Sequence, residues 1–140
     1  MDRRILPDDV LLGEVAAALH EGREVVIAPA GDSMLPFIRG GADRVVLRRR
    51  EDAAPGDIVL VRIGERYILH RIIARDGERL TLMGDGNLRK TEHCPVSAVL
   101  GTAIRIIRPD GSGRPVGKAR LWRLLRPLRR PLLAIYKRIV

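Results

Sequence analysis

A serine in a rigid turn is the first feature of this 140-residue sequence whose residue types suit chemistry. Ser33 lies in segment 31–36 (GDSMLP), where Gly31 permits an unusual backbone angle and Pro36 stiffens the following chain. A nucleophile needs such a hydroxyl, exposed and held by rigid neighbours. Asp32 and Ser33 are equally typical of an Asx or ST turn without chemistry, so the segment alone leaves both interpretations open.

A serine attacks only when a base accepts its proton, and the chain offers few bases. It has three histidines, at positions 20, 70 and 93, and three lysines, of which only Lys90 precedes residue 118. His70 lies in the apolar run 67–73, and strand alternation places it on one face with Ile68 and Ile72. Apolar surroundings favour the neutral imidazole that a general base requires, although they are also typical of a hydrogen-bonded core histidine.

The segment 84–87 (GDGN) is the third cluster, and its two glycines around an aspartate predict a turn. In a functional interpretation Asp85 approaches His70, fixes its tautomer and stabilises the imidazolium during proton transfer. Asn87 would then hold the backbone of the turn. A plain turn explains the segment equally well.

The sequence gives no support for a metal or a cofactor. His93 and Cys94 are adjacent in an expected loop, but two potential ligands do not form a metal site. Cys94 is the only cysteine, which excludes an internal disulfide and a multi-cysteine zinc site. We therefore expect a protein without either group.

The residues above fall on short β-rich runs that turn residues separate. A helix capped by Asp8 or Asp9 is expected to end near Gly22, and the Gly64-Glu65 turn predicts a hairpin. The spacing predicts a mainly β fold with a compact, partly closed sheet or barrel. The expected strands cover residues 24–28, 44–48, 57–63, 66–75, 79–83 and 99–108.

Charge divides the chain into a nearly neutral body and a cationic tail. Eight of the 26 basic residues and none of the 17 acidic residues lie in 118–140, which leaves 18 basic and 17 acidic residues before it. We expect a β domain with an N-terminal helix over 1–109, a Gly- and Pro-rich linker over 110–117, and a basic tail over 118–140. Apolar residues at steps of three and four predict that the tail is an amphipathic helix, kinked at its prolines.

The tail is typical of a segment that binds an anionic membrane surface. Packing on the body or on another chain explains its apolar stripe nearly as well, and nucleic-acid binding is disfavoured because aromatic residues make up only 3% of the chain. No apolar run approaches the roughly 20 residues of a membrane span, and no signal peptide is evident. We expect a cytoplasmic protein that is peripheral on the membrane. The expected membrane-binding residues are Trp122, Arg123, Arg126, Arg130 and Lys137.

Taken in order, the three blocks resemble the signal peptidase and LexA-like superfamily of serine peptidases. The resemblance covers roughly residues 22–105: Gly-x-Ser-Met-x-Pro, then His-Arg before apolar residues, then Gly-Asp. It implies a small, coiled, β-barrel-like fold. It also implies that Ser33 is the nucleophile and that its backbone N–H, with Met34 and Pro36, lies at the oxyanion and substrate site. The implied supporting residues are Gly31, Asp32, Arg71, Gly84 and Asn87.

The second block indicates which branch of the superfamily the chain resembles. Bacterial signal peptidases and LexA-like proteins have a lysine base, whereas the archaeal and endoplasmic-reticulum type has histidine followed by arginine, as in His70-Arg71. The third block departs from the signal peptidase box, which often has aspartate and asparagine adjacent, because Gly86 separates Asp85 from Asn87.

The function implied by the resemblance is that of a serine endopeptidase of signal peptidase type. It would cleave an extended peptide or leader with small side chains before the cut, through Ser33, His70 and Asp85. Two alternatives remain open. One is a catalytically inactive β module that binds a peptide by strand addition, and the other is a nucleic-acid binder that acts through its tail.

Overall fold

The strands form one curled sheet. The computed structural model describes residues 5–6, 12–29, 31, 33–86 and 90–117. Within these ranges the strand order is β1-β2-β3-β8-β4-β5-β6-β7, and β9 pairs with β8. The strands are β1 (Ile5–Leu6), β2 (Val25–Ile27), β3 (Arg44–Arg48), β4 (Ile58–Ile63), β5 (Arg66–Asp76), β6 (Arg79–Met83), β7 (Thr91–Pro95), β8 (Val99–Ile107) and β9 (Gly113–Pro115).

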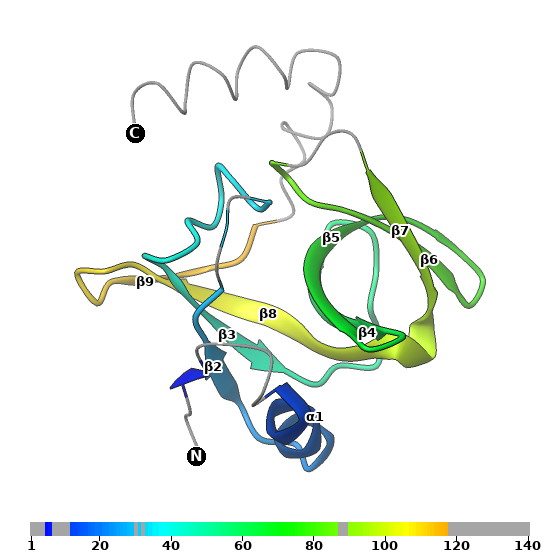
Figure 1. Cartoon of the computed structure of the whole chain (residues 1–140), viewed down its shortest axis with the longest axis horizontal. Coiled ribbons are helices and arrows are strands. Elements are labelled where there is room, and N and C mark those ends of the chain that lie inside the picture. The colour runs from blue at the N-terminus through cyan, green and yellow to red at the C-terminus, as the bar shows by residue number, and fades with distance from the viewer. Residues whose placement is uncertain (1–4, 7–11, 30, 32, 87–89, 118–140) are drawn as a thin grey trace.

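The sheet has two halves. Strands β4 to β7 curl tightly round one another, while β2, β3 and β8 form a flatter half beside helix α1 (Leu12–His20) (Figure 1). The expected mainly β, barrel-like fold with an N-terminal helix is confirmed. No helix among the described residues is both long and apolar enough to cross a membrane.

Glycine turns set the register of the curled half. Ile63 pairs with Arg66 across the two-residue loop that Gly64 begins, which confirms the expected β4–β5 hairpin. A second such loop begins at Gly77 and joins β5 to β6. Gly64 and Gly77 have φ values of 61° and 58°, the left-handed conformation that primed hairpin turns require. Both turns therefore help to fix which face of β5 carries His70.

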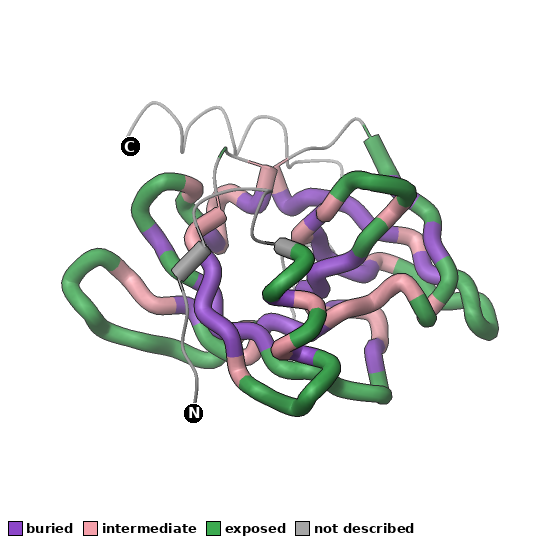
Figure 2. Tube along the Cα trace, turned by 60° about the horizontal axis from the view of Figure 1, so that its bottom comes forward, coloured by how far each residue is buried: buried purple, intermediate pink, exposed green. Residues whose placement is uncertain are grey.

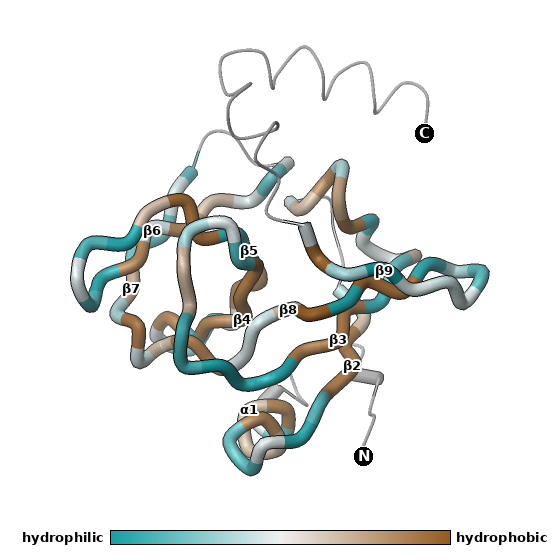
Figure 3. The backbone as a smooth tube through the Cα atoms, turned by 180° about the vertical axis from the view of Figure 1, so that it is seen from behind, coloured by the Kyte–Doolittle hydropathy of each residue, from teal (hydrophilic) through white to brown (hydrophobic). Residues whose placement is uncertain are grey.

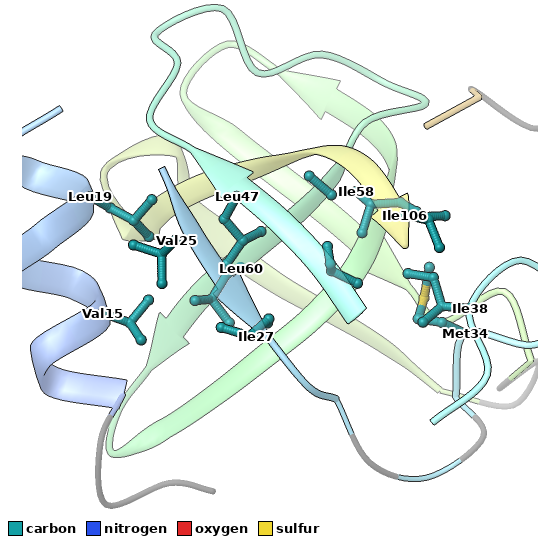
Figure 4. Close-up of a cluster of buried hydrophobic side chains, with 12 residues drawn as sticks. Val15, Leu19, Val25, Ile27, Met34, Ile38, Leu47, Ile58, Leu60 and Ile106 are labelled. Carbon is teal, nitrogen blue, oxygen red and sulfur yellow. The ribbon is translucent and has the colours of Figure 1, made fainter. Parts of the chain in front are cut away.

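Two buried clusters hold the halves together. The first packs Val15 and Leu19 of α1, together with the serine loop, against Leu47 of β3 and Leu60 of β4 (Figure 4). The helix approaches β8 closely because Gly101 has no side chain: a Cβ there would lie 3.0 Å from a Leu19 methyl. The second cluster fills the curled half and includes residues of β4, β5, β6 and β7.

The burial pattern agrees with this division. Buried stretches run through the middle of the molecule and exposed loops surround them (Figure 2). Hydrophobic residues follow β2, β3, β4 and β8, whereas the hairpin turn between β5 and β6 is hydrophilic (Figure 3). The expected strands agree closely with the observed ones, and residues 44–48 and 79–83 match in both bounds.

The structure corrects two expectations about loops. Residues 91–95, expected to be a loop around His93, form strand β7 on the outer side of β6. Residues 110–117, expected to be a linker, include strand β9, which pairs with β8. The proposed caps Asp8 and Asp9 and the C-terminal helix lie outside the described residues.

Candidate active site

Ser33 lies in a short turn that backbone hydrogen bonds close. The N–H groups of Phe37 and Ile38 both donate to the Met34 carbonyl, each at 3.0 Å. Gly31 has a φ of 79°, which agrees with the backbone freedom expected of it. Met34 is buried in the first core cluster, and the peptide bond before Pro36 is cis. The turn is therefore anchored to the core directly after the serine.

The glycine turn after β6 meets the serine turn. The Gly86 N–H donates to the Ser33 carbonyl at 2.7 Å, and the Asp85 N–H donates to the Met34 sulfur at 3.5 Å. These two bonds join segments about fifty residues apart in the sequence. They hold the serine turn against the turn that follows β6.

Gly84 marks the point where Ser33 and His70 converge. A Cβ on Gly84 would lie closer than 3.0 Å to the Ser33 carbonyl oxygen and 3.0 Å from His70 Nε2. Both atoms therefore lie within 3.0 Å of a single point. The missing side chain of Gly84 allows the serine backbone and the imidazole to occupy neighbouring positions.

The other imidazole nitrogen contacts a carboxylate. His70 Nδ1 lies 2.5 Å from Glu92 Oε1, and both residues are buried, with 8% and 9% of their surface exposed. Glu92 comes from β7, the strand that was expected to be a loop. The contact leaves Nε2 as the ring nitrogen on the side of Gly84 and Ser33.

Asp85, expected on the imidazole, pairs with Arg71 instead. Its two carboxylate oxygens accept three hydrogen bonds from Arg71, at 2.9 and 3.1 Å from Nε and 2.8 Å from Nη2. Both side chains are buried, with 1% and 3% of their surface exposed. The carboxylate on Nδ1 of His70 is that of Glu92, so the supporting acid expected from the Gly-Asp box differs from the one observed.

Arg71 joins four parts of the chain beneath the serine turn. Besides Asp85, it donates through Nη1 to the carbonyls of Gly56 and Gly117, both at 2.7 Å. Its guanidinium carbon lies 5.2 Å from the centre of the Phe37 ring, within the range of a cation–π contact. The expected supporting role of Arg71 thus has a structural basis, because a buried cation needs several partners.

Several expected site residues cannot be placed. Asp32, Asn87 and the five expected membrane-binding residues of the tail lie outside the described residues. Lys90 is described, and it is exposed immediately before β7. In the part of the chain that the structure describes, no three His, Cys, Asp or Glu side chains gather as a metal site would require.

Among the described residues, Glu92 is the carboxylate partner of His70 that the sequence analysis missed. Strand β7 alternates between exposed and buried positions, with Glu92 and Cys94 buried. An alternation of exposed and buried positions over residues 91–95 could have predicted this strand. It is hidden in the sequence because one of the two buried positions is an acid rather than an apolar residue.

Comparisons with known proteins identify the family to which this fold belongs. The model of the Peptidase S24-like family matches residues 10–104, a range that includes the serine turn, β5, β6 and β7. The LexA repressor of Pelotomaculum thermopropionicum is 30% identical over 87 residues, which are 62% of this chain and 42% of the repressor. The chain therefore matches less than half the length of this curated relative.

Proposed function

The chain belongs to the Peptidase S24-like family, and we propose that it is a serine endopeptidase with Ser33 as nucleophile and with His70, in place of the lysine of LexA-like proteins, as general base. The observation that carries the proposal is the convergence at Gly84. The Ser33 carbonyl oxygen and His70 Nε2 both lie within 3.0 Å of the point that a Gly84 Cβ would occupy. A general base must come within hydrogen-bond distance of the hydroxyl whose proton it accepts, and this convergence supports the proposal because it brings His70 Nε2 beside the serine turn.

The proposed reaction is acyl transfer to serine followed by hydrolysis. Ser33 Oγ bonds to the peptide carbonyl carbon as its proton moves to His70 Nε2. The imidazolium then gives this proton to the leaving amine, and the C–N bond breaks. Water then attacks the acyl ester while the same imidazole takes its proton; the ester C–O bond breaks, and the imidazolium returns the proton to Ser33 Oγ. The backbone N–H of Ser33 is the proposed donor to the oxyanion.

The proposed substrate is an extended peptide or leader with small side chains before the cut, as in proteases of signal peptidase type. This substrate class follows from the resemblance of the three motif blocks. Met34, expected at the substrate site, directly follows the proposed nucleophile, and its side chain is held in the core.

The experiment compares peptide products of the wild-type chain and of Ser33→Ala by mass spectrometry. A mixture of extended peptides with alanine, serine or glycine before the possible cuts is the substrate. We expect cleavage after small residues by the wild type and none by the variant. Equal cleavage by both chains would contradict the proposal. Binding of peptides without turnover by either chain would favour the inactive peptide-binding module.

The proposed role of the basic segment after Gly117 is to attach the protein to a membrane surface. Arg71, the residue after His70, donates a hydrogen bond to the Gly117 carbonyl at 2.7 Å, so the eight basic residues of 118–140 follow a point beside the site. Attachment of this segment to an anionic membrane surface would hold the site near peptides at that surface. This attachment is separate from catalysis and is tested separately below.

A further inference from the structure

Strand β7 places the buried carboxylate of Glu92 beside the imidazole of His70. Glu92 pairs with Leu82 of β6, and Leu82 pairs with Ile72 of β5, so these three residues form one row across the sheet. Two residues along β5 from Ile72, His70 lies on the same face. On β6 the corresponding step from Leu82 reaches Gly84, which has no side chain. Glu92 therefore reaches His70 diagonally, past a position that a larger residue would fill.

The two buried acids near this face have different partners. Arg71 binds both oxygens of Asp85, whereas Glu92 Oε1 lies 2.5 Å from His70 Nδ1. On the same strand as Glu92, the Cys94 thiol has a pKa that burial raises, the charge of Arg79 lowers and the charge of Glu92 raises. Because an ionised carboxylate only accepts hydrogen bonds, its neutral imidazole partner must carry its proton on Nδ1.

We propose that Glu92 is the positioning residue of the site: it holds His70 in the tautomer whose unprotonated Nε2 faces Ser33. This inference rests on the proposed function and deepens it. During the reaction the serine proton goes to Nε2, while Glu92 keeps its negative charge and stabilises the imidazolium without taking the proton. Strand β7, expected to be a loop, thereby becomes part of the catalytic scaffold.

The first test reads the imidazole directly and needs no activity. Nitrogen-15 NMR at neutral pH distinguishes Nδ1–H from Nε2–H imidazoles, and the chain has only three histidines, so His70→Gln assigns the signal. We expect an Nδ1–H tautomer in the wild type and loss of this preference in Glu92→Gln. Glu78→Gln, an exposed acid that pairs with Arg75, is the matched control and should leave the signal unchanged. An unchanged His70 signal in Glu92→Gln overturns the inference.

The second test measures kinetics. In Glu92→Gln we expect kcat to fall about 100-fold or more with little change in KM, while Glu92→Asp, which keeps the carboxylate, should recover part of the loss. Thermal unfolding shows whether each variant folds. If Glu92→Gln does not fold, the comparison is made with Glu92→Asp instead. An unchanged kcat and pH profile in a folded Glu92→Gln contradicts the inference.

The two proposals fail separately. Cleavage that persists in Ser33→Ala overturns the proposed function, whatever the tautomer of His70. A tautomer that does not depend on Glu92 overturns only its positioning role, even if Ser33 and His70 prove essential.

Discussion

The Gly86 N–H donates to the Ser33 carbonyl at 2.7 Å, which fastens the serine turn to the turn that follows β6. Arg71 binds the same glycine turn through Asp85 and contacts the serine turn through Phe37. Ser33, the proposed nucleophile, is thus held by the segment that also borders the imidazole. Rigid support of this kind is what a catalytic serine requires, because small displacements of reacting groups cost large factors in rate.

Gly84→Ala should damage the site more than the fold. The added methyl would meet the Ser33 carbonyl and His70 Nε2, so one of them must move. We expect kcat/KM to fall about 100-fold and the free energy of unfolding to fall by about 1–3 kcal/mol. Peptide cleavage and thermal unfolding measure these two effects.

Gly13→Ala is the matched control for this substitution. A Cβ on Gly13 meets nothing within 4 Å, and the residue lies in helix α1. Alanine there should leave cleavage unchanged and stabilise the helix by about 0.5–1 kcal/mol. An active Gly84→Ala variant would show that Ser33 and His70 do not depend on the space beside Gly84.

Arg71→Met should destabilise the protein by about 3–5 kcal/mol, because it leaves the buried Asp85 carboxylate without its cationic partner. Denaturant unfolding measures the change. Arg62→Met is the control, since Arg62 is exposed on β4 and lies over the Tyr67 ring; its effect should stay below about 1 kcal/mol. Equal stability of the two variants would contradict the structural role of the Arg71–Asp85 pair.

Cys94 should react slowly with thiol reagents while the protein is folded. Burial raises the pKa of the Cys94 thiol, which lowers its thiolate fraction, and the residue is only 3% exposed. We expect labelling near neutral pH to be slow in buffer and fast in denaturant. The raised pKa also predicts a loss of stability in alkali, because unfolding then releases a proton that the folded thiol keeps. Equal labelling rates would mean that the Cys94 side chain is not buried in the second core cluster.

Deletion of residues 118–140 tests the proposed membrane attachment. We expect the full chain to float with vesicles that contain anionic lipid and not with neutral vesicles, and the truncated chain to float with neither. Arg105→Gln, which removes an exposed arginine of the body, should float like the full chain. Salt-sensitive binding of duplex DNA by the tail, without flotation, would favour the nucleic-acid alternative.

The sequence predicted the strands whose ends are marked by turn residues. Residues 44–48 and 79–83 match in both bounds, because glycine turns precede them and their buried positions are apolar. Strand β7 escaped prediction because its residues, Thr-Glu-His-Cys-Pro, are polar or poor strand formers, and its alternation appears only when Glu92 is seen to be buried. Strand β9 is short and exposed, so its composition resembles that of a linker.

The site was predicted in part for a related reason. Ser33 and His70 were found because they stand in recognisable blocks, and the structure brings them to neighbouring positions at Gly84. Which of Asp85 and Glu92 contacts His70 depends on which of these acids Arg71 binds. That choice is a three-dimensional property, since Arg71 and Asp85 are fourteen residues apart and face each other only across β5 and β6.

The identity of the base decides the whole mechanism, and one comparison of rates tests it. Peptide cleavage is measured for the wild type, His70→Ala and Lys90→Ala under identical conditions. We expect kcat/KM to fall at least about 100-fold in His70→Ala, because general-base catalysis is lost, and to change less than about twofold in Lys90→Ala, an exposed lysine before β7. An inactive Lys90→Ala beside an active His70→Ala would mean that a lysine, and not the imidazole, accepts the proton of Ser33.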